Sequence, residues 1–278
     1  MIDSHIHVIP PGLPGVGPLS PLLEGSADVL AARLRSEMQE AGIQQALAMG
    51  SLPGADDDPL GINGTLALAR QVPGLHAIGI ADPSRSDPEH LHRVDRVLAT
   101  GQVRALKGYL GYLHYGPEHP GYVPYYELAE RYGVPVVFHT GDTYSPRAKL
   151  RYAHPLAVDD VAVDHPKVRF VLAHLGNPWV LDAAEVVYKN VNVWADLSGL
   201  VVGEEAAFIA DERREPLLEI AAAMRSAFRY AERPNRFLYG SDWPLAPMRA
   251  YRDFIRTVIP EVYQQQVFED NARALFRL

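Results

Sequence analysis

Short apolar runs rich in β-branched residues alternate along the chain with longer segments of helical periodicity. The apolar runs predict eight strands, and the segments between them leave room for a loop, a helix and a return turn. We expect the strands near residues 2–7, 43–49, 75–80, 103–107, 134–139, 168–174, 190–196 and 236–242. This pattern favours a single (β/α)8 TIM-barrel domain over residues 1–278, in preference to a doubly wound open sheet.

The segments between the predicted strands carry helix start and stop signals. Asp87 and Pro88 form an N-cap followed by proline at the first helical position, and Gly101 lies just past the expected end of that helix. Gly133 ends another helix in the same way. Residues 268–278 predict a last amphipathic helix, packed against the outside of the barrel.

Residues 10–24 interrupt this alternation, because their many prolines and glycines exclude regular structure. Such a segment is either an exposed connector or a wall or lid over a site. It follows the first predicted strand and therefore lies at the mouth of the barrel, which favours the wall or lid.

Composition narrows the functional classes. The formal net charge of −8 and the absence of Lys/Arg runs argue against a nucleic-acid or anionic-membrane partner. The sequence contains no run of about 18 apolar residues, so it predicts no membrane-spanning helix. No secretory signal precedes the first strand, so a cytoplasmic location is expected. Cysteine is absent, so a metal here needs nitrogen and oxygen ligands.

Five side chains that can bind metal or move protons stand at the ends of predicted strands: His5, His7, His139, His174 and Asp242. In a barrel of parallel strands these ends face the active-site mouth, so the side chains are expected to converge. Singly, each has an ordinary interpretation: a polar surface pair, a hydrogen-bonded core histidine, or a helix N-cap. Together they predict a shared metal or proton-transfer site, in which Asp3 can orient a histidine ring.

Several motifs around these residues resemble the amidohydrolase superfamily, and more narrowly its "amidohydrolase 2" branch of metal-dependent TIM-barrel hydrolases and decarboxylases. The motifs are Asp-Ser-His-Ile-His at residues 3–7, the strand-end His139, Ala-His-Leu-Gly-Asn-Pro-Trp at 173–179, Gly-Ser-Asp-Trp-Pro at 240–244 and Asn-Ala-Arg-Ala-Leu-Phe at 271–276. The resemblance therefore extends from the first predicted strand to the end of the chain.

The resemblance implies a role for each of these residues. His5, His7, His139 and Asp242 would hold one divalent metal, zinc or alternatively manganese. His174 would lie beside the metal as a catalytic acid or electrostatic group. Asp242 would also accept a proton from a water whose pKa the metal lowers.

Lys107 ends the fourth predicted strand and has three interpretations. It can contact substrate, which we favour. It can be carboxylated and bridge two metals, as in binuclear members of the superfamily, in which case His139 and His174 would bind the second metal. It can also simply reach solvent at the mouth.

Other candidates for substrate binding lie on loops after the predicted strands. Arg147 belongs to a loop with cations at alternate positions, suited to a carboxylate or simply solvated. Tyr109 belongs to a tyrosine-rich loop that either faces substrate or packs on the rim. Trp243 is expected to wall the pocket or cover the barrel top. Asp196 and Ser198 can reach the pocket or cap a helix.

The leading functional hypothesis is a metal-dependent hydrolase of a small carboxylic ester, lactone or amide. The alternative is a metal-dependent decarboxylase of an aromatic or muconate-type acid, and a non-catalytic binding barrel is the third. The expected partner is a small molecule that carries a carboxylate. The resemblance is also compatible with a homodimer, although no exposed face of the sequence specifies one.

Overall fold

The structure is a computed structural model that describes residues 1–52 and 54–278. Eight strands form one sheet in the order β1 to β8, and each pairs in parallel with the next. The strands are β1 (Ile2–Ile6), β2 (Gln45–Met49), β3 (Leu75–Ile80), β4 (Val103–Gly108), β5 (Val136–Phe138), β6 (Phe170–Leu172), β7 (Val193–Asp196) and β8 (Phe237–Leu238). The eight predicted strands and the (β/α)8 architecture are thus confirmed.

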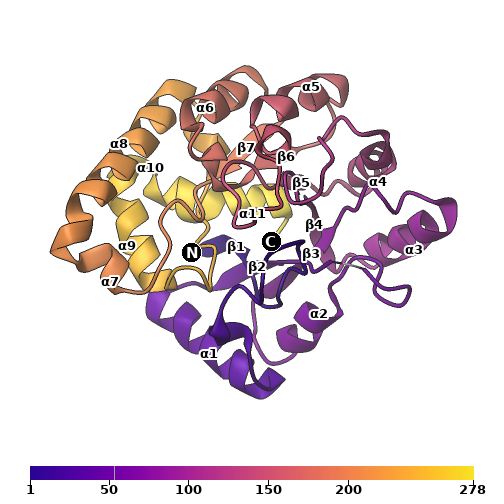
Figure 1. Cartoon of the computed structure of the whole chain (residues 1–278), viewed down its shortest axis with the longest axis horizontal. Coiled ribbons are helices and arrows are strands. Elements are labelled where there is room, and N and C mark those ends of the chain that lie inside the picture. The colour runs from indigo at the N-terminus through magenta and orange to yellow at the C-terminus, as the bar shows by residue number, and fades with distance from the viewer. Residues whose placement is uncertain (53) are drawn as a thin grey trace.

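The first and last strands come together and nearly close the barrel. The backbone N–H of Ser4 donates to the Tyr239 carbonyl at 2.9 Å, and the Ser4 hydroxyl donates to the same oxygen at 2.7 Å. Further along the two segments, Ile6 forms a parallel bridge with Trp243. Figure 1 shows the strands at the centre and the helices around them.

Helices follow the strands as the alternating pattern predicts. They are α1 (Ala27–Ala41), α2 (Asn63–Ala69), α3 (Pro88–Ala99), α4 (Val123–Tyr132), α5 (Leu156–Asp164), α6 (Val180–Lys189), α7 (Ala206–Ile209), α8 (Arg214–Ala231), α9 (Met248–Val258), α10 (Glu261–Gln265) and α11 (Asn271–Phe276). The Asp87 side chain accepts from the backbone N–H of His90 and begins α3, as expected for an N-cap. Gly133 ends α4 with φ +62°. A π-helical turn, Gln266–Asp270, joins α10 to α11.

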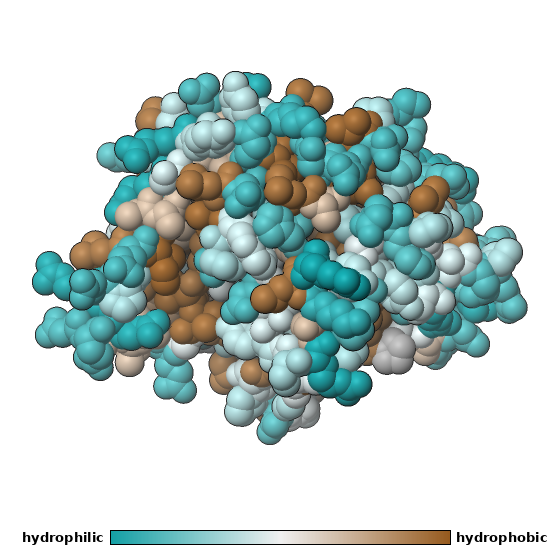
Figure 2. All heavy atoms as spheres, turned by 45° about the horizontal axis from the view of Figure 1, so that its top comes forward, coloured by the Kyte–Doolittle hydropathy of each residue, from teal (hydrophilic) through white to brown (hydrophobic). Residues whose placement is uncertain are grey.

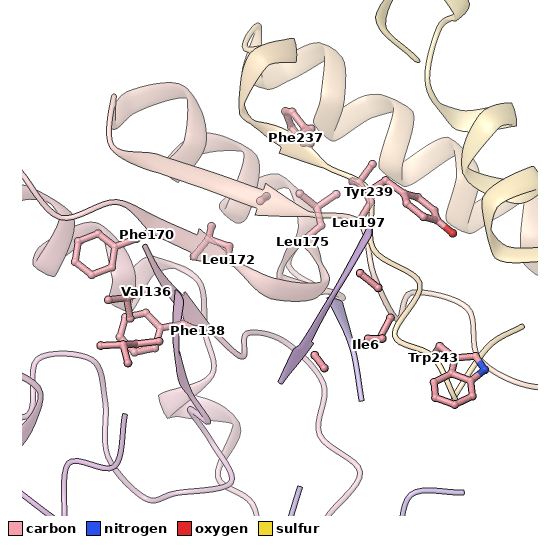
Figure 3. Close-up of a cluster of buried hydrophobic side chains, with 14 of the residues drawn as sticks. Ile6, Val136, Phe138, Phe170, Leu172, Leu175, Leu197, Phe237, Tyr239 and Trp243 are labelled. Atoms are coloured by element: carbon pink, nitrogen blue, oxygen red, sulfur yellow. The ribbon is translucent and has the colours of Figure 1, made fainter. Parts of the chain in front are cut away.

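The core has two layers, because successive strand residues point to opposite sides of the sheet. The outer layer lies between strands and helices, and there Phe138 of β5 stacks on Phe170 of β6 with ring centroids 6.0 Å apart (Figure 3). The inner layer fills the barrel with residues such as Leu47, Val137 and Val171.

The final helix covers one end of the barrel. Leu275 and Phe276 of α11 belong to the same buried cluster as the barrel interior. The Arg169 guanidinium, just before β6, donates to the Leu275 carbonyl at 3.0 Å. The helix therefore covers the amino ends of the strands, whereas the sequence pattern predicts that it packs against the outside of the barrel. The carboxyl ends remain for the site.

The outer surface is mainly polar. Hydrophilic residues cover most of the face in Figure 2, and hydrophobic residues gather at its left, the side on which α7, α8 and α9 lie in Figure 1. Phe208, Leu217 and Phe254 line a depression between these helices. Among the described helices, none combines the length and apolar character that a membrane crossing requires.

Candidate metal centre

Alternation along the strands determines which side chains reach the site. Ala105 and Val137 belong to the inner core, so Lys107 and His139, each two positions later, point the same way at the carboxyl ends of β4 and β5. Both line a cavity of about 150 Å³ at this end of the barrel. The inner core continues directly into the floor of the cavity.

An irregularity in β1 places its two histidines. The register between β1 and β2 shifts between Asp3 and Ile6, and Ile2 packs in the inner core whereas Ile6 packs in the outer one. A regular strand would turn both isoleucines to the same side. The shift therefore re-aims the end of the strand, as β-bulges do, and His5 and His7 both line the cavity.

Two further cavity residues have an unusual backbone. His174 has φ +61° and Asp242 has φ +60°. Left-handed backbone is disfavoured for residues with a Cβ, and such strain concentrates at functional sites. Gly199 lies against both: an added Cβ would stand 2.7 Å from Asp242 Oδ2 and 2.8 Å from His174 Nδ1.

The arrangement of His5 and Asp242 is the strongest indication that the site can hold a cation. His5 Nδ1 lies 2.9 Å from the carboxyl oxygen Oδ2 of Asp196, a hydrogen-bond acceptor, so this nitrogen carries the hydrogen. His5 Nε2 then keeps its lone pair and faces Asp242 Oδ1, also an acceptor, at 3.7 Å. Both atoms are buried and have no hydrogen-bond partner among the described residues. Two facing acceptors without a donor are reconciled by a cation between them.

His7 completes this arrangement. Its Nε2 lies 3.5 Å from Asp242 Oδ1, and His5, His7 and Asp242 each bring one ligand atom within 4.8 Å of the others. Two ligands at tetrahedral zinc, each about 2.0–2.2 Å from the metal, lie about 3.4 Å apart. The three side chains therefore fit a divalent cation in both chemistry and spacing.

The electrostatics keep these imidazoles neutral, as metal ligands must be. Burial lowers the pKa of His7 and His139 from 6.5 to about 3, and the neighbouring Lys107 ammonium adds to the effect. Burial also lowers the pKa of His5 and His174 well below the usual value. Burial raises the pKa of the Asp242 carboxyl, and Lys107 opposes that rise.

His139 and His174 lie side by side, with ring centroids 4.9 Å apart. His139 Nε2 donates to the Asp142 carbonyl at 2.9 Å, which leaves the Nδ1 lone pair free for a ligand role. His174 Nδ1 lies 3.1 Å from the Ser198 carbonyl and therefore carries a hydrogen. His139 belongs to neither group of closely spaced ligand atoms, whereas His174 groups with His5 and Asp196.

Of the four residues that the sequence predicts to contact substrate, two line the cavity and two do not. Lys107 and Tyr109 line the cavity. The Lys107 ammonium is buried without a hydrogen-bond partner among the described residues, which excludes the interpretation that it reaches solvent. Tyr109 offers only its ring, because its hydroxyl donates to the Gly50 carbonyl at 2.7 Å.

Arg147 and Trp243 do not line the cavity. Arg147 is exposed on the loop after β5, in keeping with the alternative that this loop is simply solvated. Trp243 is 1% exposed and packs in the outer core, with its backbone paired to Ile6 where the barrel closes (Figure 3). A substrate contact of either residue is not supported.

The segment 10–24 supplies a cavity wall, through Pro11, Leu13, Val16 and Leu19. Apart from a 3₁₀ turn at Pro21–Leu23 it has no helix or strand, as its composition predicts.

Other lining residues were not singled out from the sequence: Tyr112, Asp142, Asn177 and Gly199. Tyr112 accepts from the Tyr144 backbone N–H at 2.9 Å, and its own hydroxyl hydrogen has no acceptor among the described residues. In the sequence, the feature that points to Tyr112 is its position in the tyrosine-rich loop after the fourth strand.

Solved structures of the same fold cover nearly the whole chain. An amidohydrolase from Burkholderia multivorans with bound zinc has 17% sequence identity and a TM-score of 0.68, over 100% of this chain and 99% of that one. A probable 2-pyrone-4,6-dicarboxylic acid hydrolase from Acinetobacter baumannii, with citric acid bound, has 16% identity and a TM-score of 0.67, over 100% and 99%. The 5-carboxyvanillate decarboxylase from Sphingomonas paucimobilis has 17% identity and a TM-score of 0.61, over 100% and 98%.

A comparison with curated proteins finds no match. The family model described as amidohydrolase, of the amidohydrolase 2 type, matches residues 2–278. This match covers the strand-end histidines, Asp242 and the closing helix, and so agrees with the motifs in the sequence. The chain belongs to the amidohydrolase 2 family of the amidohydrolase superfamily.

Proposed function

We propose that this protein is a metal-dependent hydrolase that acts on a small carboxylate-bearing ester, lactone or amide. The observation that supports the proposal is the pair of facing acceptors, His5 Nε2 and Asp242 Oδ1, on a cavity floor that also holds the Lys107 ammonium. The described residues offer this ammonium no hydrogen-bond partner. His5, His7, His139 and Asp242 would hold one divalent metal, zinc or manganese. Such a metal supplies a Lewis acid and lowers the pKa of water.

The Asp242 carboxylate is placed for two tasks. Oδ1 faces the paired histidines of β1, and Oδ2 lies 3.9 Å from His174 Nδ1. One oxygen can therefore serve as a ligand while the other accepts a proton from the attacking water. Burial raises the pKa of this carboxyl, which favours its uptake of a proton.

His174 is expected to act on the substrate through Nε2. Its Nδ1–H donates to Ser198, and its backbone N–H donates to Asp196 Oδ1 at 3.0 Å, so the ring is fixed from both sides. The ring is neutral, so Nε2 keeps a lone pair and can accept a hydrogen bond or a proton from the substrate. The proton that Asp242 accepts from water then goes to the leaving group from Asp242 itself.

Lys107 would hold the substrate carboxylate. A buried ammonium without a partner is costly, and a carboxylate in the cavity would neutralise it. Tyr112 lines the same cavity, and its hydroxyl hydrogen has no acceptor in residues 1–52 and 54–278, so it can donate to the same group.

The same cation supports a second candidate, a decarboxylase, because Lys107 would then hold the carboxylate that leaves as carbon dioxide. The solved structures of the same fold include both a probable pyrone-dicarboxylic acid hydrolase and a carboxyvanillate decarboxylase. A direct test supplies zinc- or manganese-loaded enzyme with 2-pyrone-4,6-dicarboxylate and with 5-carboxyvanillate. Ring opening without carbon dioxide supports the hydrolase, and carbon dioxide release supports the decarboxylase. Asp242→Asn should abolish either reaction, whereas the exposed control Asp164→Asn should not.

A further inference from the structure

The catalytic cavity adjoins a second, outer depression. This space of about 330 Å³ is lined by Val16, Pro18, Leu19, Pro21, Tyr144 and Leu245, together with Gly15, Gly17 and Ser20, and we call it the outer groove. Four of these residues, Val16, Leu19, Tyr144 and Leu245, also line the catalytic cavity. The two spaces therefore share a wall, and a molecule that extends out of the cavity meets the groove.

The chemistry changes between the two spaces. The cavity floor presents His5, Asp242 and Lys107, whereas none of the residues lining the outer groove is charged. Valine, leucine, proline and tyrosine side chains dominate the groove, and Tyr144 is 53% exposed. A polar floor that leads to an apolar exit suits an amphiphilic molecule with its polar head inside.

Hydrogen bonds hold the walls of the groove in place. The Ser145 hydroxyl donates to the Pro14 carbonyl at 2.7 Å and ties the loop after β5 to the loop after β1. Within segment 10–24, the Ser20 hydroxyl accepts from the Leu22 N–H at 3.1 Å. The Gly203 N–H donates to the carbonyl of Leu245, another residue that lines the groove, at 2.8 Å. The groove is therefore built into the folded protein.

We propose that the outer groove binds an apolar extension of the substrate, so that this enzyme acts on carboxylates with an aliphatic or aromatic tail. The position of the head at Lys107 rests on the proposed function. The position of the tail rests on the groove alone. Each methylene that enters the groove should strengthen binding about fourfold, as expected for burial of a CH₂ group.

The test measures the affinity of zinc-loaded protein for butanoate, hexanoate and octanoate, and for the matched 1-alkanols, by ligand-observed NMR titration. Gly17→Phe fills the groove: a Cβ at this position has nothing within 4 Å, and its backbone is not left-handed. Val16→Asp is a second variant that places a charge on the shared wall. Val262→Phe, at a position 79% exposed on α10, is the matched control.

The groove proposal predicts that affinity rises with chain length in both series and that Gly17→Phe and Val16→Asp remove most of that rise, at least tenfold for octanoate relative to butanoate. Val262→Phe should keep the rise. A flat series, or a rise that both groove variants leave intact, overturns the proposal. A third outcome separates the two proposals. If affinity rises with chain length, but carboxylates bind no better than alcohols to the wild type and Lys107→Met does not change this, the groove proposal stands. The proposed function, which places a substrate carboxylate at Lys107, then fails.

Discussion

His5 Nδ1 lies 2.9 Å from Oδ2 of Asp196, and this contact turns the other ring nitrogen toward Asp242. Asp196 ends β7 and lies 191 residues after His5 in the sequence. The carboxylate fixes both the tautomer and the orientation of the imidazole, as carboxylates behind metal-bound histidines generally do. It also accepts from the backbone N–H groups of His174 and Ser198.

Replacing Asp196 with Asn should lower zinc affinity about 10- to 100-fold, because the amide no longer supplies a charged acceptor to His5. Competition with a chromophoric chelator measures the affinity, and chemical denaturation shows whether the fold is retained. Asp159→Asn, at a carboxylate that binds Lys189 far from the site, is the control. Wild-type affinity in Asp196→Asn would refute the orienting role.

Gly199→Ala should reduce kcat/KM about 100-fold or more, because its Cβ would displace Asp242 Oδ2 and His174 Nδ1. Gly101→Ala is a matched control, since Gly101 has φ +71° but nothing within 4 Å of an added Cβ. Both variants should lose stability from the left-handed backbone. Equal activity in the two variants would show that crowding at Gly199 has no catalytic consequence.

Lys107→Met should raise KM for a carboxylate substrate tenfold or more, since a hydrogen bond to a charged group contributes about 1.5–3 kcal/mol. The free energy of unfolding should rise rather than fall, because burial lowers the pKa of this ammonium and so disfavours its charged form. Steady-state kinetics and urea denaturation provide the two readouts. The control is Lys149→Met on the exposed loop after β5, where KM should not change. A destabilised Lys107→Met with unchanged KM would indicate a purely structural lysine.

Tyr112→Phe is expected to affect substrate binding, whereas Tyr109→Phe is expected to affect stability. The first removes a hydroxyl hydrogen that is free to reach substrate, so KM should rise. The second leaves the buried Gly50 carbonyl without its donor, so the free energy of unfolding should fall by about 1–3 kcal/mol. Kinetics and denaturation of both variants separate the effects. A rise in KM confined to Tyr109→Phe would reverse the two roles.

The fold and the convergence of the site follow from local sequence. A run of apolar residues that ends in histidine, as before His139, reveals both the strand and the direction of its last side chain. The exposure of Arg147 and the burial of Trp243 depend on contacts with distant segments. Trp243 follows Asp242 directly, yet its backbone pairs with Ile6, and no local pattern encodes that pairing. The contact between Asp196 and His5 could not be predicted from the sequence either. A carboxylate at the end of a strand can also cap a helix, and the local sequence does not distinguish the two roles.

We expect His5, His7, His139 and Asp242 to hold one divalent metal. The most direct test is plasma mass spectrometry of untagged protein purified without chelators, for wild type and for His7→Ala. We predict about one zinc or manganese per wild-type chain, the content of a mononuclear site, and a strong loss in the variant. Wild-type protein that contains no metal and takes none up would contradict the account, as would about two metals per chain, the content of a lysine-bridged binuclear centre.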